Sequence, residues 1–298
     1  MAVDAPSSYY GEDDDWGAPG PVLEAGEHLA PGYRVISLLR RGNRLDVYDL
    51  WSEERGCRCV GKTLRPERAE DTTAAGWLRG EGMLLGSLTH PHLVRGYETV
   101  LSIDPARPVV ITETLPGATL SYLLDQHARL RPVDAAILGI QLCSVLGYLH
   151  RQGWAHLDVK PSNVVSAGGR AVLLDLSLAC RIGEHNTAGT FDYLSPEQAR
   201  GGEMTAATDV WGLGITLWEA LSGAPPWADV SHRQRRDDGS RHYPQLDGAP
   251  PPLRTRRRLP ARLSRTVDAC LAPDPGARPS IDEVATRLIT WSGIDPTA

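Results

Sequence analysis

A short stretch in the middle of the chain concentrates side chains that could hold and transfer a phosphoryl group. It reads His156-Leu-Asp-Val-Lys-Pro-Ser-Asn163, and an apolar run ending in Asp175 follows it. Phosphoryl transfer requires a protein to orient a hydroxyl, neutralise phosphate charge and hold a cation. The Asp158 carboxylate, the Lys160 ammonium and the Asn163 amide supply such groups on one loop. Asp175 adds a hard oxygen ligand of the kind that Mg²⁺ prefers.

This stretch resembles the catalytic loop of the protein-kinase family, H-R-D-x-K-P-x-N, and departs from it at Leu157. Further family signatures follow in the correct order and spacing between about Tyr33 and Trp291. They are Cys59-Val-Gly-Lys62, Asp175-Leu-Ser177, Gly189-Thr190, Ser195-Pro-Glu197, Asp209-Val-Trp-Gly-Leu-Gly214 and Asp274-Pro-Gly-Ala-Arg278-Pro279. Each motif is weak alone, but chance does not produce the ordered series. The chain is identified as similar to the eukaryotic-like (bacterial Hanks-type) serine/threonine protein kinases.

The resemblance implies catalytic roles for five residues. Asp158 would receive or orient the substrate hydroxyl, and Lys160 would contact the transferring phosphate. Lys62 would bind the α- and β-phosphates of ATP, with Glu81 as its ion-pair partner. The Thr190 hydroxyl would bridge Asp158 and Lys160 and shape a site for an aliphatic acceptor. The metal ligands for Mg²⁺ implied in the same way are Asn163 and Asp175.

The resemblance also implies an adenine site between two lobes. Adenine would bond to backbone groups of Glu113 and Leu115, with Thr112 at the gatekeeper position. Apolar residues would sandwich the ring, although they would serve equally well as core residues. The implied nucleotide-binding residues are Gly42, Val47, Val60, Lys62, Thr112, Glu113, Leu115 and Val165.

The phosphate-covering loop departs most from the family. The pattern G-x-G-x-x-G-x-V aligns with residues 40–47, where Gly42 is the one glycine that remains and Leu45 replaces the last. Glycine lets backbone N–H groups approach phosphates closely, so we expect weakened ATP affinity. Charge could be supplied instead by Arg40, Arg41 or Arg44.

Three other departures concern regulation and coupling. Leu157 replaces the arginine that holds a phosphorylated activation loop in many kinases, so we expect activity without activation-loop phosphorylation. Ser177 replaces the glycine of D-F-G and should restrict flipping of the backbone. Gly96 stands where a bulky residue normally completes a stacked spine.

Apolar periodicity predicts the elements that must position these residues. Strands are expected at 33–39, 46–51, 58–64 and 109–112, and a helix at 67–88. Helices are then expected at 132–150 and 208–221, and a last helix starts at Ser280, whose side chain pairs with Glu283 in a capping box.

The fold class expected from this order is α+β, a bilobal protein-kinase fold. A small β-rich N-lobe with one main helix would span 28–115, and a larger helical C-lobe 116–292. Residues 1–27 are rich in Pro, Gly, Ser and Asp and predict a flexible acidic tail, and 293–298 a C-terminal tail.

Composition limits the kinds of partner and the cellular compartment that we expect for this protein. The formal net charge of −6 argues against nucleic acid as a partner. No uninterrupted apolar run reaches the ~18 residues of a membrane span. Five scattered cysteines fit reduced thiols, so we expect a cytoplasmic protein without a membrane span. The expected partner is a protein substrate with a Ser or Thr acceptor; nothing in the sequence indicates an oligomeric state.

Two other function classes remain open. A pseudokinase, meaning the same fold used as a nucleotide-binding regulatory module, is favoured by the depleted glycine loop and by Leu157. Retention of six charged or polar site residues argues for the enzyme. A small-molecule phosphotransferase would share the catalytic loop but typically lacks the Ser195-Pro-Glu197 segment and its Arg278 partner.

Overall fold

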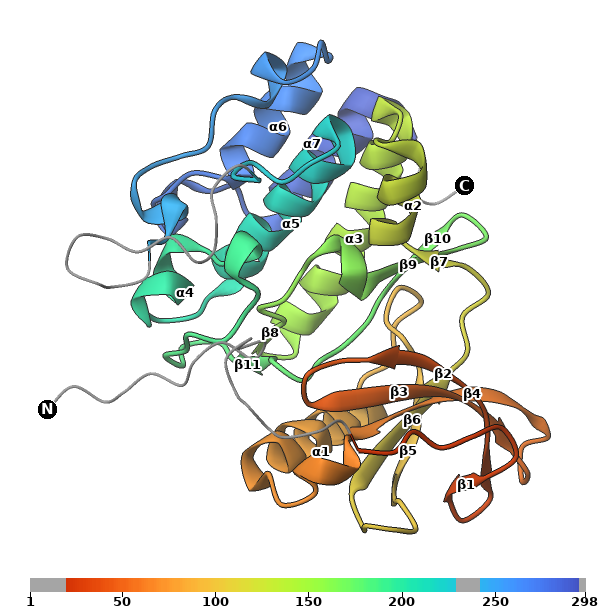
Figure 1. Cartoon of the computed structure of the whole chain (residues 1–298). Helices are drawn as coiled ribbons and strands as arrows, with labels where there is room; N and C mark the ends of the chain where they lie inside the picture. Colours follow the sequence, from red (N-terminus) through yellow and green to blue (C-terminus); the bar gives the residue numbers. More distant parts are fainter. Residues whose placement is uncertain (1–19, 229–241, 295–298) are drawn as a thin grey trace, which may run out of the picture. The chain divides into compact units, whose positions relative to one another are not determined.

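The computed structural model describes residues 20–228 and 242–294, and the chain divides into two compact units (Figure 1). The strand-rich unit holds residues 20–116 together with 175–177. The helical unit holds residues 117–174 and the described residues from 178 onward. Most of the predicted N-terminal tail, and most of the C-terminal tail, lie outside the described residues.

Six antiparallel strands form one sheet in the strand-rich unit, in the order β1-β2-β3-β4-β6-β5. They are β1 (His28–Ala30), β2 (Tyr33–Arg41), β3 (Leu45–Ser52), β4 (Cys57–Leu64), β5 (Gly96–Leu101) and β6 (Pro108–Glu113). The four strands predicted from the sequence are confirmed as β2, β3, β4 and β6. The sequence analysis missed β1, which is three residues long, and β5, which is largely exposed and lacks a clear apolar face.

One helix, α1 (Thr72–Ser87), packs against β5 and β6 of this sheet (Figure 1). The Asp71 carboxylate accepts a hydrogen bond from the N–H of Ala74 at 2.9 Å and caps the helix. The predicted start at residue 67 is therefore wrong. The preceding residues form a short 3-10 helix, Pro66–Arg68, because the Asp71 cap fixes where the α-helix can begin.

Two glycines let α1 approach the sheet at close range. A Cβ atom at Gly82 would overlap the hydroxyl of Thr99 on β5. A Cβ atom at Gly96 would lie 2.6 Å from the Cβ of Leu85 on α1, closer than real contacts allow. The space that a bulky residue at position 96 would fill is thus occupied by Leu85. This packing sets the depth at which α1 carries Glu81.

Substitution Gly96→Ala should destabilise the fold, because the added methyl group meets the α1 backbone. We expect a loss of about 1–3 kcal/mol in the free energy of unfolding, measured by urea denaturation. The matched control is Gly76→Ala on the exposed side of α1, where a Cβ meets nothing within 4 Å. That change should stabilise by about 0.5–1 kcal/mol through helix propensity. Equal midpoints for the two variants would contradict the packing argument.

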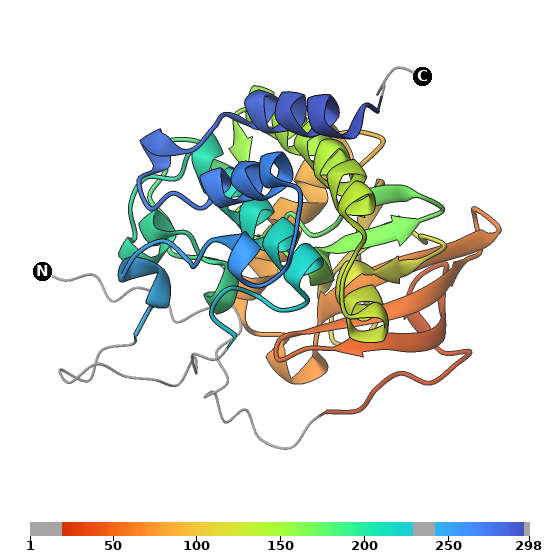
Figure 2. The same ribbon diagram turned by 90° about the horizontal axis from the view of Figure 1, so that it is seen from above.

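The helical unit is built around α5 (Ala206–Ser222), which is buried along nearly its whole length and includes the fully buried Trp211 and Trp218. Helices α3 (Pro132–Arg151), α6 (Ala261–Cys270) and α7 (Ile281–Ser292) pack around it (Figure 2). The helices predicted at 132–150 and 208–221 are confirmed, as is the Ser280–Glu283 capping box of the last helix. The shorter helices of this unit are α2 (Leu120–His127) and α4 (Pro196–Arg200).

Short strands and 3-10 turns complete the helical unit. A three-stranded sheet has the order β10-β9-β7, and β11 pairs with β8. The strands are β7 (Ala118–Thr119), β8 (Trp154–Ala155), β9 (Val164–Ala167), β10 (Arg170–Leu173) and β11 (Cys180–Arg181). The 3-10 helices are Pro161–Asn163, Phe191–Tyr193, Pro244–Leu246, Leu253–Thr255 and Pro275–Ala277. These strands flank the loop that carries the predicted catalytic residues.

Helix α3 is the one helix in the described ranges that is long and apolar enough to cross a membrane. Of its most apolar stretch, 56% is buried inside the protein. The core helix of a folded domain meets the same criteria, so this is weak evidence for a span.

Candidate active site

Four predicted site residues come together on the catalytic loop and the segment after it. The Asp158 side chain is buried, and its Oδ1 accepts a hydrogen bond from the Thr190 hydroxyl at 2.7 Å. Its Oδ2 accepts from the Asn163 amide at 2.9 Å and lies 2.7 Å from the Lys160 ammonium. Lys160 also donates to the Thr190 oxygen. Thr190 thus stands between Asp158 and Lys160, and donors on both oxygens fix the orientation of the Asp158 carboxylate.

The backbone of this loop is held by Asp209 on α5. Its two carboxylate oxygens accept the N–H groups of His156 and Leu157, each at 2.8 Å. His150 lies 2.8 Å from the same carboxylate. Burial would raise the pKa of Asp209, but the hydrogen bonds from His150 and His156 outweigh it and hold the pKa below its usual range. Asp209 therefore stays ionised and acts as a fixed acceptor for the loop.

Leu157 adopts a left-handed backbone conformation, with a φ of 66°, which is uncommon for a residue with a branched side chain. Its side chain is buried in an apolar cluster with Ala155, Cys180 and Met204. The family's arginine at this position would instead point to a phosphate. The structure fills the position with apolar packing, while independence of activity from activation-loop phosphorylation stays a prediction.

Gln198 is a positioning residue that the sequence analysis missed. Its amide donates to the carbonyl of Leu157 at 3.0 Å and to the carbonyl of Ala188 at 2.8 Å. Its own place is fixed by a capping box with Ser195 at the start of α4. The spacing from Ser195 to Gln198 signals a helix cap in the sequence, but it does not reveal the two carbonyl partners.

A second constellation, of charged side chains, lies in the strand-rich unit. The ammonium of Lys62 on β4 is 2.9 Å from Oε2 of Glu81 and 2.8 Å from Oδ1 of Asp175. The Ser177 N–H donates to Asp175 at 3.1 Å, and the Ser177 hydroxyl donates to the same oxygen. The backbone of Asp175 adopts a left-handed conformation, with a φ of 61°. The ion pair expected between Lys62 and Glu81 is present, and Asp175 shares the lysine.

Asp175 and Glu81 share the Lys62 ammonium, but their pKa values shift in opposite directions. Burial would raise the pKa of Asp175, but the Lys62 charge and the hydrogen bonds from Ser177 outweigh it and hold the pKa well below its usual range. Glu81 is the deeper group, with 4% of its side chain exposed against 20% for Asp175. Burial outweighs the Lys62 charge, the negative Asp175 acts in the same direction, and the pKa of Glu81 rises to about 7.

This raised pKa gives folding a pH dependence. A carboxyl whose pKa rises from 4.5 to about 7 on folding favours the folded state fully below pH 4.5, and this contribution is lost as the pH rises through 7. The free energy of unfolding of the wild type, relative to Glu81→Gln, should therefore fall by on the order of 3 kcal/mol across that window. Urea unfolding at a series of pH values measures it.

Glu70→Gln is the matched control, because Glu70 is an exposed glutamate just before the same helix. Its difference from the wild type should stay flat over the same pH range. A flat difference for Glu81→Gln as well would show that Glu81 is ionised throughout.

The predicted nucleotide-binding residues are divided between the two units. Val47 on β3, Val60 on β4 and Thr112 on β6 belong to the strand-rich unit, where Val60 pairs with Thr112 and Val47 with Lys62. Glu113 ends β6, and its N–H donates to the Arg95 carbonyl at 2.9 Å. Leu115 follows β6, Gly42 lies in the turn between β2 and β3, and Val165 lies on β9 of the helical unit. Their contacts with ATP stay predictions.

The phosphate-covering turn is tied down by ion pairs that the sequence analysis did not foresee. Arg41 Nε lies 3.4 Å from the buried carboxylate of Asp46, and its Nη2 lies 3.5 Å from Glu67. Burial raises the pKa of Asp46, and the neighbouring Arg41 opposes that shift. Within the strand-rich unit, Arg41 thus links the turn to the 3-10 helix that precedes α1.

The other end of the turn is held in a similar way. Arg44 lies 3.7 Å from Asp71, the cap of α1, and over the ring of Trp77. Arg65 donates to the Gly42 carbonyl at 3.4 Å, and its N–H donates to the Arg44 carbonyl at 2.9 Å. Two of the three arginines expected to offer charge to phosphates therefore already have carboxylate partners. Ion pairs hold this turn where the family uses glycines.

Substitution Arg41→Gln should loosen the turn and remove the positive charge that is paired with the Asp46 carboxylate. We expect the ATP KM to rise about three- to tenfold with little change in kcat, because a half-buried ion pair contributes roughly 1 kcal/mol. The matched control is Arg34→Gln, which removes an exposed arginine paired with Glu53 near the start of β2, at the opposite end of that strand from the turn, and should leave the ATP KM unchanged. Equal effects of both substitutions would mean that the turn responds to net charge and not to the ion pair.

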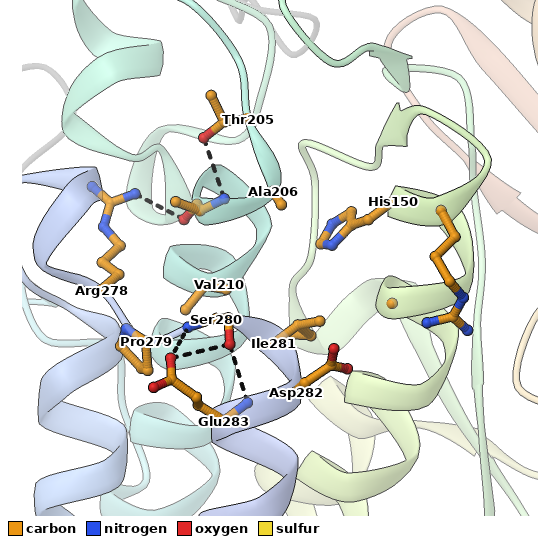
Figure 3. Close-up of a pocket in the computed structure, with 13 residues that line it drawn as sticks. His150, Thr205, Ala206, Val210, Arg278, Pro279, Ser280, Ile281, Asp282 and Glu283 are labelled. Carbon is orange, nitrogen blue, oxygen red and sulfur yellow. Dashed lines mark hydrogen bonds between the residues drawn. The ribbon is translucent and has the colours of Figure 1, made fainter.

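A bidentate ion pair supports the segment after the catalytic loop. Arg278 Nη1 and Nη2 lie 2.7 and 2.8 Å from the two carboxylate oxygens of Glu197, and Nη1 donates to the Ala207 carbonyl at 2.8 Å. Figure 3 shows Arg278 beside the starts of α5 and α7, at a cavity of about 660 Å³. The Ser280–Glu283 cap and Arg278 line this cavity, and no predicted site residue does. It is a junction of the scaffold.

Among the side chains of residues 20–228 and 242–294, no group of three or more His, Cys, Asp or Glu could hold a metal ion alone. Asn163 and Asp175 nevertheless suit Mg²⁺. The Asn163 amide nitrogen donates to the Asp158 carbonyl and carboxylate, so the amide oxygen is the side chain's acceptor. Among the described residues, the groups that donate to Asp175 are Lys62 and Ser177, and both reach its Oδ1. Its Oδ2 is therefore left for a cation. Mg²⁺ typically takes its remaining ligands from phosphates and water.

Comparison with known proteins identifies the class. The protein kinase domain family matches residues 33–288, and the chain belongs to that family. Among its relatives are serine/threonine-protein kinase PknB of Mycobacterium tuberculosis, 31% identical over 84% of this chain, and a probable serine/threonine-protein kinase of Streptomyces coelicolor, 32% identical over 70%. The chain covers 41% and 33% of these relatives' lengths.

Solved structures agree on the fold. The kinase domain of Mycobacterium tuberculosis PknI, solved as a double mutant, has a TM-score of 0.71 to this chain at 24% identity, covering 92% of this chain and all of that domain. The predictions of the bacterial serine/threonine kinase family and of the α+β kinase fold are confirmed.

Proposed function

We propose that this chain is an ATP- and Mg²⁺-dependent serine/threonine protein kinase that transfers the γ-phosphoryl group to a protein hydroxyl. The observation that carries the proposal is the arrangement around Asp158. Its carboxylate is buried, ordered by Asn163 and Lys160, and bridged by the Thr190 hydroxyl. A carboxylate fixed in this way can accept the hydrogen bond of an incoming serine or threonine hydroxyl and orient its oxygen.

The other retained side chains would act by charge. Lys160 would neutralise negative charge on the transferring group, and Lys62 would hold the nucleotide phosphates, with Glu81 fixing the lysine. Mg²⁺, held by Asn163 and Asp175, would neutralise the phosphate oxygens when bound. The low pKa of Asp175 supports this, because an ionised carboxylate is the form that binds a cation.

The acceptor class rests on Lys160 and Thr190. They contact each other beside Asp158, the arrangement that the resemblance associates with an aliphatic acceptor, and the relatives named above are serine/threonine-protein kinases. We further propose that the chain itself acts in the cytoplasm, on a protein substrate. All five cysteines are unpaired, as is usual in a reducing compartment.

The alternative is a nucleotide-binding regulatory module without phosphoryl transfer. The turn between β2 and β3 favours it, because Leu45 replaces a glycine and the arginines of the turn are paired with carboxylates. Such a protein would bind ATP but incorporate no phosphate.

Substitution Asp158→Asn separates the two readings. It keeps the shape of the side chain but removes the negative charge that orients the acceptor hydroxyl, so phosphate incorporation into a generic basic protein should fall at least about a hundredfold. Transfer of labelled γ-phosphate from Mg·ATP measures it, and binding of a fluorescent ATP analogue should change little.

The control is Asp134→Asn, which removes an exposed carboxylate of α3 that pairs with Arg131. It should retain full activity. A wild type that binds the analogue but transfers no more phosphate than Asp158→Asn would establish the regulatory module instead.

A further inference from the structure

A groove between α6 and α7 is separate from every residue assigned to the active site. Its volume is about 410 Å³. α6 contributes Arg262, Arg265 and Thr266, and α7 contributes Thr286, Arg287, Thr290 and Trp291. The two helices lie side by side in the helical unit (Figure 2). Arg262 and Arg265 are three residues apart on α6, so their side chains share one face of the helix.

The side chains that line the groove carry positive charge and no negative charge. The three arginines are exposed, and in the described part of the chain none lies within 4.0 Å of a carboxylate. No aspartate or glutamate lines the groove. Glu283, one turn before Arg287 on α7, accepts hydrogen bonds from the N–H and hydroxyl of Ser280, and its negative charge partly offsets that of Arg287. In a chain of net charge −6, three positive side chains around one small groove are a local excess that suits an anion.

The hydrogen-bonding capacity of the groove points to the same kind of ligand. The Thr266 hydroxyl donates to the Arg262 carbonyl at 2.9 Å, and the Thr286 hydroxyl donates to the Asp282 carbonyl at 2.8 Å. Their protons are thus used within the helices. The donors that remain are the Thr290 hydroxyl, the indole N–H of Trp291 and the N–H groups of the three guanidinium forks. Three forks offer more N–H groups than one carboxylate can accept, and each fork can bind two oxygens of a phosphate.

We propose that this groove binds a phosphoserine or phosphothreonine within a segment of a protein partner. The phosphoryl group, with a charge of about −1.5 to −2 and three acceptor oxygens, would sit among the three guanidinium groups. An apolar side chain near it would lie against the partly exposed indole of Trp291. This proposal rests on the proposed function, because the phosphoserine or phosphothreonine that the groove would bind is the product of that reaction. The groove would retain partners that already carry one phosphate.

Fluorescence anisotropy of the full chain tests the proposal without any catalytic step. The probe is a fluorescein-labelled glycine–alanine peptide that carries one phosphothreonine and a leucine two residues after it. Wild type and Asp158→Asn should bind it equally. Arg265→Gln and Arg287→Gln should each weaken binding about tenfold, because each removes a charge-assisted hydrogen bond. Raising the salt concentration should also weaken it.

The matched control is Arg129→Gln, an exposed arginine on the loop between α2 and α3 outside the groove, which should bind as wild type does. Thermal unfolding checks that all variants are folded, and transfer to the generic substrate should be unchanged in the three arginine variants. Equal affinity for the same peptide with glutamate or unmodified threonine, or equal weakening by Arg129→Gln, would overturn the proposal. If the wild type bound the peptide but transferred no phosphate, that result would contradict the proposed function and leave the binding proposal standing.

Discussion

The carboxylate of Asp209 fixes the backbone on which the proposed catalytic side chains are carried. It accepts the N–H groups of His156 and Leu157, although Leu157 must take a left-handed conformation to present its own. Such a conformation costs on the order of 1–3 kcal/mol. Hydrogen bonds to a charged acceptor contribute roughly 1.5–3 kcal/mol each and can offset that strain. Because α5 is buried on nearly all sides, Asp209 is held in place. It fixes the backbone just before Asp158, and so it limits the movement of Asp158 as well.

In the strand-rich unit, the central interaction is the contact of Lys62 with two acids, Glu81 and Asp175. The close packing of α1 on the sheet at Gly82 and Gly96 places Glu81 deep beside Lys62. Asp175 stays charged because the Lys62 charge and the hydrogen bonds from Ser177 outweigh its burial, whereas at Glu81 burial outweighs the Lys62 charge. The unit therefore offers one reliable anion and one group that changes its charge near neutral pH.

Much of the fold and the chemistry could be read from the sequence, because both impose patterns on it. Catalytic groups must be of fixed types, and long helices such as α3 and α5 carry continuous apolar signals. Contacts that depend on tertiary packing left no such pattern. Gln198 reaches Leu157 across 41 positions, and Arg41 meets Glu67 only because the turn folds onto the 3-10 helix that precedes α1. The start of α1 was misplaced because the Asp71 cap outweighs apolar spacing.

The strand-rich unit is discontinuous in the chain, since residues 175–177 belong with 20–116. A fragment cut after Pro116 would keep Lys62 and Glu81 but lose Asp175 and Ser177. The lysine would then serve a single acid, and Glu81, freed from the neighbouring negative charge, would ionise at lower pH. Dissecting the protein into its apparent halves would thus alter the electrostatics of the half it isolates, even if that half kept its shape.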